Sequence, residues 1–223
     1  MSETDRFLGY VADAARAYPP SFSRPRHLGG PRYNINERPS ADLRSLAPPV
    51  LDQGRTQSCT GQAAKVMLDV ALARELRSER ASARALYTLA RYFTTTPGER
   101  LVDSGAHFRQ TFVQSMEFGV VNEKDCPWEE SKVDYDLPFD GLINAPSGLL
   151  RVTDWATLDD PTGRSVQVRR WLDAGCAVGG GWPVTKAFQR HTDKFYDADE
   201  DDTDEVGLHA MAILAYQVGL DGE

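Results

Sequence analysis

The stretch that decides the fold is residues 48–63, which read PPVLDQGRTQSCTGQA. Its first half is rich in proline, glycine and small polar residues, which favour turns. After Cys59, apolar residues recur at positions 63, 66, 67, 70 and 71, and neither proline nor glycine occurs from 62 to 96. This spacing predicts a helix from Cys59 to about Arg77. We expect its buried face to consist of Ala63, Val66, Met67 and Val70.

A cysteine at the start of a long helix is suited to nucleophilic chemistry. The helix start carries partial positive charge and N–H groups without intrahelical partners, and both favour the nucleophilic thiolate. Gln53 lies six residues earlier, so a turn can bring its carboxamide beside the sulfur. Together with the Cys59 backbone N–H, that amide could bind a developing oxyanion. Taken alone, a cysteine such as Cys59 is more often a buried structural residue than a nucleophile. Gln53 could be a turn residue, but its spacing from Cys59 favours an oxyanion donor.

This segment resembles the active-site signature of the papain-like, C1-type cysteine peptidases. In that family a glutamine-glycine pair precedes the catalytic cysteine by the same spacing. Ser58-Cys59-Thr60 is similar to a bacterial, xylellain-like branch, with Thr60 in place of the usual tryptophan. Asp42-Leu43-Arg44 also matches that branch, and the resemblance covers roughly residues 40–217.

The resemblance extends to the second half of the chain and implies an activity. Residues 207–216, GLHAMAILAY, resemble the strand that carries the family's catalytic histidine, which would be His209. Ser104 and Gly105 would contribute to substrate binding. The resemblance implies a cysteine-type peptidase that hydrolyses peptide bonds through a thioester acyl-enzyme, with peptide or protein substrates.

The expected fold class is α+β, with a helical lobe, a β-rich partial barrel and the site in the cleft between them. We expect a propeptide-like N-terminal arm at 1–40, the helical lobe at 41–150 and the β-rich lobe at 151–223. The arm is rich in proline and aromatic residues, which favours an extended segment laid over the body. Further elements are expected as helices at 82–93, 108–118 and 166–173, strands at 176–182 and 209–217, and an acidic loop at 197–205.

The sequence departs from the family at one point. An Asn-Ser-Trp-Gly segment, whose asparagine normally orients the histidine, does not follow His209 within these 223 residues. A fragment, a split subunit and a degenerate relative all stay open as explanations. The alternative function is therefore a catalytically inactive or incomplete papain-like module that acts in protein binding. We also expect residues 209–217 to have an unpaired strand edge, open to a partner strand or to self-association.

Charge and composition exclude several classes of function. A net charge of −8 disfavours binding to nucleic acid and to anionic membranes. The arginine-rich segment 74–91 also contains Glu75 and Glu79, so we interpret it as a solvated, ion-paired helix face. Without a recognisable signal peptide or an apolar span, the expected location is the cytoplasm, or export by another signal.

We expect no cofactor and no metal. Motifs of the types C-x-x-C and H-E-x-x-H are absent, and the acidic loop does not match the calcium-loop pattern. Three cysteines form no even disulfide framework. We interpret Cys126 and Cys176 as packing residues, because neither has a helix-start or basic context. His27, His107 and His191 are expected on the surface, with His191 as the reserve candidate for the base.

Overall fold

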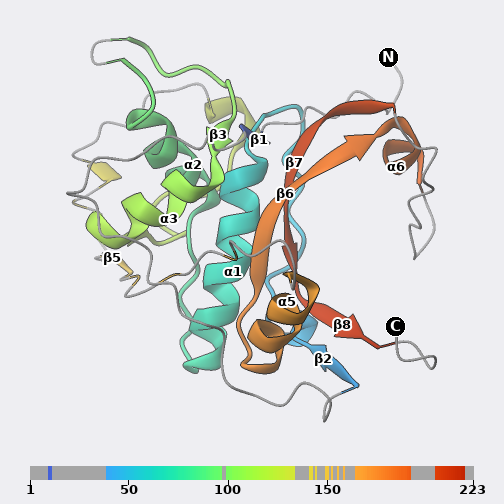
Figure 1. Cartoon of the computed structure of the whole chain (residues 1–223). Helices are drawn as coiled ribbons and strands as arrows, with labels where there is room; N and C mark the ends of the chain where they lie inside the picture. The colour runs from blue at the N-terminus through green and yellow to red at the C-terminus, as the bar shows by residue number, and fades with distance from the viewer. Residues whose placement is uncertain are drawn as a thin grey trace.

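A long helix at the centre of the molecule separates shorter helices on one side from a two-stranded ribbon on the other (Figure 1). The computed structural model describes residues 10–11, 39–96, 99–133, 141–142, 144, 149–150, 152, 155, 158, 164–191 and 204–218. The central helix is α1, Cys59–Arg74. It begins at Cys59, as predicted.

Helix α1 ends three residues before the predicted Arg77, because the chain turns into the left-handed region at Leu76, where φ is 57°. The Leu76 N–H donates to Ala73 O, and the Arg77 N–H donates to Leu72 O, each at 3.0 Å. These two bonds form a Schellman motif, which normally has glycine at the left-handed position. Because leucine occupies that position here, the sequence gives no signal that the helix ends.

Most sides of α1 are buried, which the periodicity did not predict. Ala63 and Val70 are buried as expected, whereas Val66 and Met67 are only half-buried. Two charged residues are buried instead: Lys65 Nζ lies 3.0 Å from Asp69 Oδ2 and donates to Ala81 O at 2.7 Å. Asp69 Oδ1 accepts the Ala81 N–H at 2.7 Å. A charged pair inside the molecule therefore joins α1 to the segment that leads into the next helix.

Helices α2, Ala83–Tyr92, and α3, Phe108–Glu117, pack beside α1 and confirm the ranges predicted for them. Ser82 caps α2 by accepting the Ala85 N–H, and Gly119, with φ of 90°, follows the end of α3. Arg77 and Glu79 form an ion pair, but they are half-buried and lie between α1 and α2, so the expectation of a solvated helix face is wrong there. It is also wrong for Arg84 and Arg91, which are buried.

The ribbon consists of β6, Val178–Thr185, and β7, Glu205–Ile213, in antiparallel register. Both strands differ from the predicted ranges, and β7 begins inside the expected acidic loop, where Glu205 pairs with Thr185. A Cβ at Gly179 would collide with Met67 Sδ and lie 2.6 Å from the Phe108 ring. Glycine therefore allows β6 to approach α1 and α3 closely. Helices α5, Arg164–Asp173, and α6, Lys186–Arg190, precede and follow β6 in the sequence.

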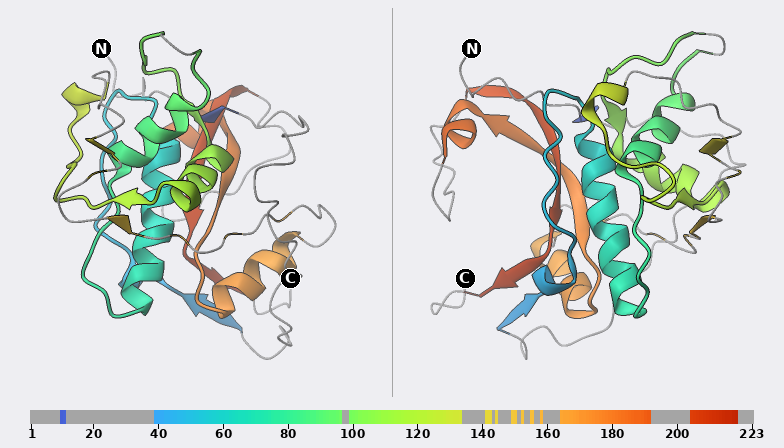
Figure 2. Two further views of the ribbon diagram at one scale, coloured as in Figure 1. Left: turned by 90° about the vertical axis from the view of Figure 1, so that its left-hand side faces the viewer. Right: turned by 180° about the vertical axis from the view of Figure 1, so that it is seen from behind.

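The remaining strands form short pairs around this framework (Figure 2). Within the described part of the chain every sheet has two strands, and no closed barrel forms. Two of these pairs are antiparallel: β2, Ser40–Asp42, pairs with β8, Ala215–Gln217, and β4, Val120–Val121, pairs with β5, Leu149–Leu150. The third pair is parallel and joins β1, Tyr10–Val11, to β3, Ala106–His107. Two 3-10 helices, η2 at Arg44–Leu46 and η3 at Glu130–Lys132, complete the described elements.

The strand predicted at 209–217 is divided at Leu214, and its second part has a partner in the same chain. Its Leu214 carbonyl accepts the Leu43 N–H at 2.8 Å, and β2 pairs with β8 along residues 215–217. Ile213, expected to face a solvent-exposed gap, packs against the cluster that contains Val70 and Leu172. The expected unpaired edge is thus covered at β8 by residues 40–42. Self-association along β7 stays a prediction.

None of the helices in the described part is both long enough and apolar enough to cross a membrane.

Candidate active site

The loop before α1, residues 53–58, is folded tightly onto itself, and we call it the nucleophile loop. The Gln53 carbonyl accepts the Thr56 N–H at 3.3 Å and the Thr56 hydroxyl at 2.8 Å. The Gln53 Nε2 donates to Thr56 O at 2.9 Å, which uses one of the two N–H groups of the carboxamide. Thr56 Oγ1 lies 2.7 Å from Ser58 Oγ. The Gln53 side chain is therefore held in a defined orientation five residues before Ser58, the N-cap of α1.

Gly54 is required by the path of this loop. Its φ is 61°, and a Cβ there would overlap the Glu130 carboxylate. That carboxylate accepts the Arg55 N–H at 2.8 Å, and Trp128 Nε1 donates to Asp52 O at 3.1 Å. Residues 128–130 thus support the loop from one side. Glycine is therefore needed at position 54 for two reasons: the backbone is in the left-handed region, and the Glu130 carboxylate leaves no room for a Cβ.

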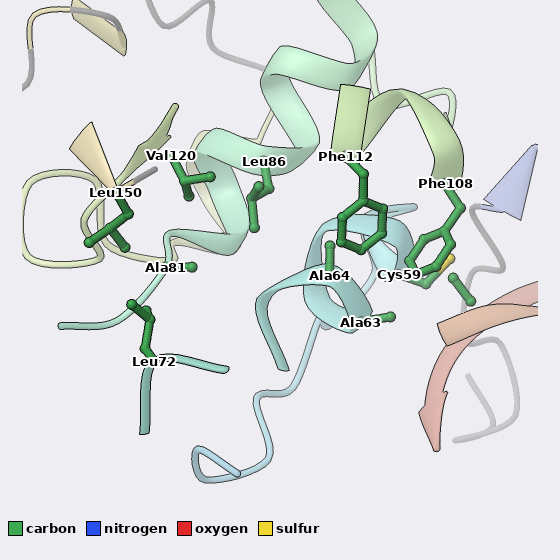
Figure 3. Packing of buried hydrophobic residues seen from close by; sticks show 11 residues of the cluster. Cys59, Ala63, Ala64, Leu72, Ala81, Leu86, Phe108, Phe112, Val120 and Leu150 are labelled. Atoms are coloured by element: carbon green, nitrogen blue, oxygen red, sulfur yellow. The ribbon is translucent and has the colours of Figure 1, made fainter. Parts of the chain in front are cut away.

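Cys59 is the first residue of α1 and is only 1% exposed. It belongs to a hydrophobic cluster with Ala63, Phe108 and Ala210. In Figure 3, Phe108 and Phe112 point from α3 toward the start of α1, where Cys59 lies. The cysteine therefore has the helix start predicted for a nucleophile, together with the burial expected of a structural cysteine.

His209 lies on β7, which packs beside α1, and the next residue, Ala210, belongs to the same hydrophobic cluster as Cys59 and Ala63. The His209 ring is half-buried, and its Nδ1 is shielded from solvent. Trp182 stands opposite His209 in the β6–β7 register. The fold thus brings together the two segments that carry Cys59 and His209, although 150 residues of sequence separate them.

Ser104 and Gly105 lie in a turn, residues 102–105, that is bonded to the nucleophile loop. Ser104 is exposed, whereas Gly105 is buried with φ of 80°. Asp103, between Val102 and Ser104, accepts the Gln57 N–H, at 3.0 Å on Oδ1 and 2.9 Å on Oδ2. Strand β3 lies between this turn and α3, which begins at Phe108 as predicted. The sequence analysis did not assign Asp103 to the site.

The other two cysteines differ from Cys59 in their surroundings. Cys126 is buried among Ala85, Leu89 and Val121, and burial raises the pKa of its thiol. This agrees with a packing role. Cys176 is half-buried, and Arg74 Nη1 lies 3.6 Å from its sulfur, so the expected lack of a basic context is wrong there. All three cysteines are free thiols.

The described histidines outside β7 are half-buried rather than on the surface. His107 precedes α3 and His191 follows α6, whereas His27 lies outside the described residues. Residues 197–203 of the acidic loop also lie outside them. Among the residues that the structure describes, no group of three or more His, Cys, Asp or Glu side chains could hold a metal ion.

No family model matches the chain, and a search of curated proteins finds no match. Among solved structures, xylellain, a cysteine protease from Xylella fastidiosa, matches with a TM-score of 0.70 at 21% identity, over 96% of this chain and 81% of that chain. The fold is papain-like. Digestive procathepsin L 3 of Tenebrio molitor matches with a TM-score of 0.67 at 15% identity, over 97% of this chain and 63% of its own.

Bromelain from Ananas comosus has the same papain-like fold, with a TM-score of 0.60 at 14% identity, over 83% of this chain and 79% of that chain. The predicted α+β, papain-like architecture is confirmed. The matching structures are cysteine proteases by description, and at these identities the likeness establishes the fold of this chain.

Proposed function

We propose that this chain is a papain-like cysteine peptidase that hydrolyses peptide bonds through a thioester acyl-enzyme. The observation that carries the proposal is the position of Cys59. It is the first residue of the central helix, beside the strand that bears His209 and directly after a loop that holds the Gln53 carboxamide. The papain-like fold supports the same assignment.

In the proposed reaction, Cys59 and His209 form a thiolate–imidazolium pair. The Cys59 sulfur attacks the scissile carbonyl carbon, and the carbonyl electrons move onto oxygen. His209 then donates its proton to the leaving amine as the C–N bond breaks, which leaves a thioester on Cys59. Water attacks that thioester with His209 as base, the C–S bond breaks, and release of the carboxylic acid restores the thiolate–imidazolium pair.

Gln53 is the proposed oxyanion donor, together with the Cys59 backbone N–H. A donor is effective when it is held in place before the reaction, so that no reorganisation is needed as charge develops. The bond from Gln53 Nε2 to Thr56 O supports this role, because it fixes the plane of the carboxamide. Ser104 and Gly105 are the proposed substrate-binding residues on the adjoining turn.

The N-terminal arm, residues 1–40, is proposed to act as a propeptide-like segment ahead of a helical lobe at 41–150 and a β-rich lobe at 151–223. Strand β1 of the arm pairs with β3, immediately after Ser104-Gly105, and it also contacts β7. A segment in that position would compete with an extended substrate for the backbone of Ala106–His107.

The experiment that tests the proposed function is labelling with a peptidyl electrophile at neutral pH, followed by peptide mapping. We expect the label on Cys59 and its loss in Cys59→Ala and His209→Ala. Cys126 and Cys176 are internal controls, and burial keeps Cys126 slow because it raises the pKa of that thiol. Labelling of Cys59 no faster than that of the two controls would contradict the peptidase proposal and favour the inactive, protein-binding module.

A further inference from the structure

Asp103 lies at the centre of a hydrogen-bond network that joins the nucleophile loop to the 102–105 turn. Its two carboxylate oxygens accept the Gln57 N–H at 3.0 and 2.9 Å, and its backbone carbonyl accepts Gln57 Nε2 at 2.6 Å. Gln57 is therefore bonded to Asp103 through both its backbone and its side chain. Only Ser58 separates Gln57 from Cys59.

Helix α2 fixes the other end of the network. The Tyr87 hydroxyl donates to Asp103 Oδ1 at 2.6 Å and accepts the Gly105 N–H at 3.0 Å. Burial raises the pKa of this hydroxyl, so it remains a protonated donor across the usual working range of pH. Arg91, stacked 4.0 Å above the Tyr87 ring, donates to Val102 O at 2.7 Å. Tyr87 and Arg91 thus hold the turn from Val102 to Gly105 on a rigid element.

The three free cysteines show that no disulfide ties the nucleophile loop to its surroundings. The bonds between Asp103 and Gln57 provide a non-covalent tie at that place. Bonds to an ionised acceptor are shorter and stronger than neutral ones. The same carboxylate also reaches, through Tyr87, the turn that carries Ser104 and Gly105.

We propose that Asp103 is a positioning residue, which holds Gln57 so that the Cys59 N–H and the Gln53 carboxamide converge on the oxyanion, and which links them through Tyr87 to the substrate-binding turn. This proposal rests on the proposed peptidase function. Each contact has its own predicted effect. The bonds between Asp103 and Gln57 affect the chemical step, and the bond between Tyr87 and Gly105 affects substrate binding.

The test compares Asp103→Ala, Asp103→Asn and Tyr87→Phe in the full chain, with Asp42→Asn as control, since the Asp42–Arg44 pair is exposed and distant from Cys59 in the fold. The substrate is a small p-nitrophenyl ester of an N-acylated amino acid, and the rate of Cys59→Ala is subtracted.

For Asp103→Ala we expect kcat to fall about 10- to 100-fold, as for a misplaced oxyanion donor. Asp103→Asn keeps the volume and one acceptor, so its loss should be smaller. Tyr87→Phe should raise KM more than it lowers kcat.

A second readout separates positioning from general destabilisation. Alkylation of Cys59 by iodoacetamide develops no oxyanion, so its rate in folded Asp103→Ala should stay within about twofold of the unmodified chain. Equal losses in ester hydrolysis and alkylation, or a kcat within about twofold of that of Asp42→Asn, would overturn the proposal.

A third readout does not depend on activity. Hydrogen exchange in peptides that cover residues 53–60 should be faster in Asp103→Ala than in Asp42→Asn, because the Gln57 N–H loses its acceptor, and Asp103→Asn, which keeps one acceptor, should lie between the two. If the unmodified chain hydrolyses no ester above Cys59→Ala, the proposed peptidase function fails, and this exchange still decides whether Asp103 holds the loop. Unchanged exchange would overturn the inference by itself.

Discussion

At the scale of single residues, the turns before and after α1 each contain a residue with positive φ, Gly54 and Leu76. Gly54 satisfies this need in the nucleophile loop with no side chain, where a Cβ would overlap Glu130. Leu76 occupies the same backbone region at the end of α1 while carrying a large side chain that is 95% exposed. Gly54 therefore fits the left-handed conformation, whereas Leu76 is strained by it.

Leu76→Gly should stabilise the chain. The left-handed conformation costs a residue with a Cβ roughly 1–2 kcal/mol, and the extra unfolded-state freedom of glycine offsets part of that gain. We expect the free energy of unfolding to rise by about 0.5–1 kcal/mol, measured by urea denaturation. Leu76→Ala keeps the Cβ and is the matched control, with little change expected. A Leu76→Gly chain no more stable than Leu76→Ala would show that the turn is not strained.

At the scale of secondary-structure elements, α1 is fastened to the segment before α2 by charges rather than by apolar contacts alone. Lys65 and Asp69 are both buried, and Glu123 Oε2 lies 3.4 Å from Lys65 Nζ. Burial raises the pKa of Asp69, against the lowering effects of the Ala81 N–H and of Lys65. Removing one member of such a pair leaves the other charge buried without compensation.

Lys65→Met should therefore be strongly destabilising, by about 3 kcal/mol or more at neutral pH. Without the cation, the pKa of Asp69 in the folded state should rise further above its unfolded value. A raised folded pKa means that protonation favours the folded chain, so the loss should be full above that pKa and should shrink as the pH falls toward the unfolded value.

Urea unfolding of Lys65→Met and the unmodified chain, compared at neutral and mildly acidic pH, measures this loss. Arg77→Met is the matched control, because the side chains of the Arg77–Glu79 pair are 38% exposed and an ion pair at the surface contributes little. A loss equal to that of Arg77→Met, or one that grows as the pH falls, would contradict the assigned role of the pair.

The elements predicted correctly are those whose ends have local signals. The helix start at Cys59, the Ser82 cap and the Gly119 stop all come from neighbouring residues in the sequence. The burial of Lys65 and Asp69 was missed because helical periodicity assigns charged residues to the solvent side. The start of β7 at Glu205 was missed because its pairing with Thr185 is set by a distant strand.

The same distinction applies to the candidate site. Cys59, the proposed nucleophile, and the Gln53-Gly54 pair lie within one short segment, so their proximity could be inferred from spacing. His209 was assigned from resemblance, since nothing local to a histidine on an apolar strand distinguishes a catalytic residue from a structural one. Asp103 was not identified because its partner Gln57 lies 46 positions away, and a single sequence carries no signal of that contact.

At the scale of the whole molecule, the N-terminal region contacts the body at two separate places. Strand β1 lies beside β3 and β7, near the start of α1, and β2 pairs with β8 at the opposite end of the ribbon (Figure 1). The Val218 N–H also donates to Pro39 O at 2.8 Å. The contact of β2 with β8 is therefore part of the fold. A deletion that tests the contact of β1 with β3 must leave residues 39–42 in place.

Deleting residues 1–38 should raise the reactivity of Cys59 toward a peptidyl electrophile, because β1 no longer lies between β3 and β7. A two-residue strand that must be displaced costs on the order of 1.4 kcal/mol, so we expect a rate increase on the order of tenfold. Labelling of Cys59 with time, read by mass spectrometry, measures this rate.

Deletion of residues 1–8 is the matched control, because it shortens the arm but keeps Tyr10–Val11. Val11→Pro provides a second test in the full-length chain, since proline fixes φ and removes an N–H from the strand. It should raise the labelling rate in the same direction as the longer deletion, while the rate with iodoacetamide, a much smaller reagent, changes less. If the longer deletion and Val11→Pro both label at the rate of the 1–8 deletion, with thermal unfolding unchanged, then β1 does not restrict access to Cys59 and the propeptide-like role of the arm is wrong.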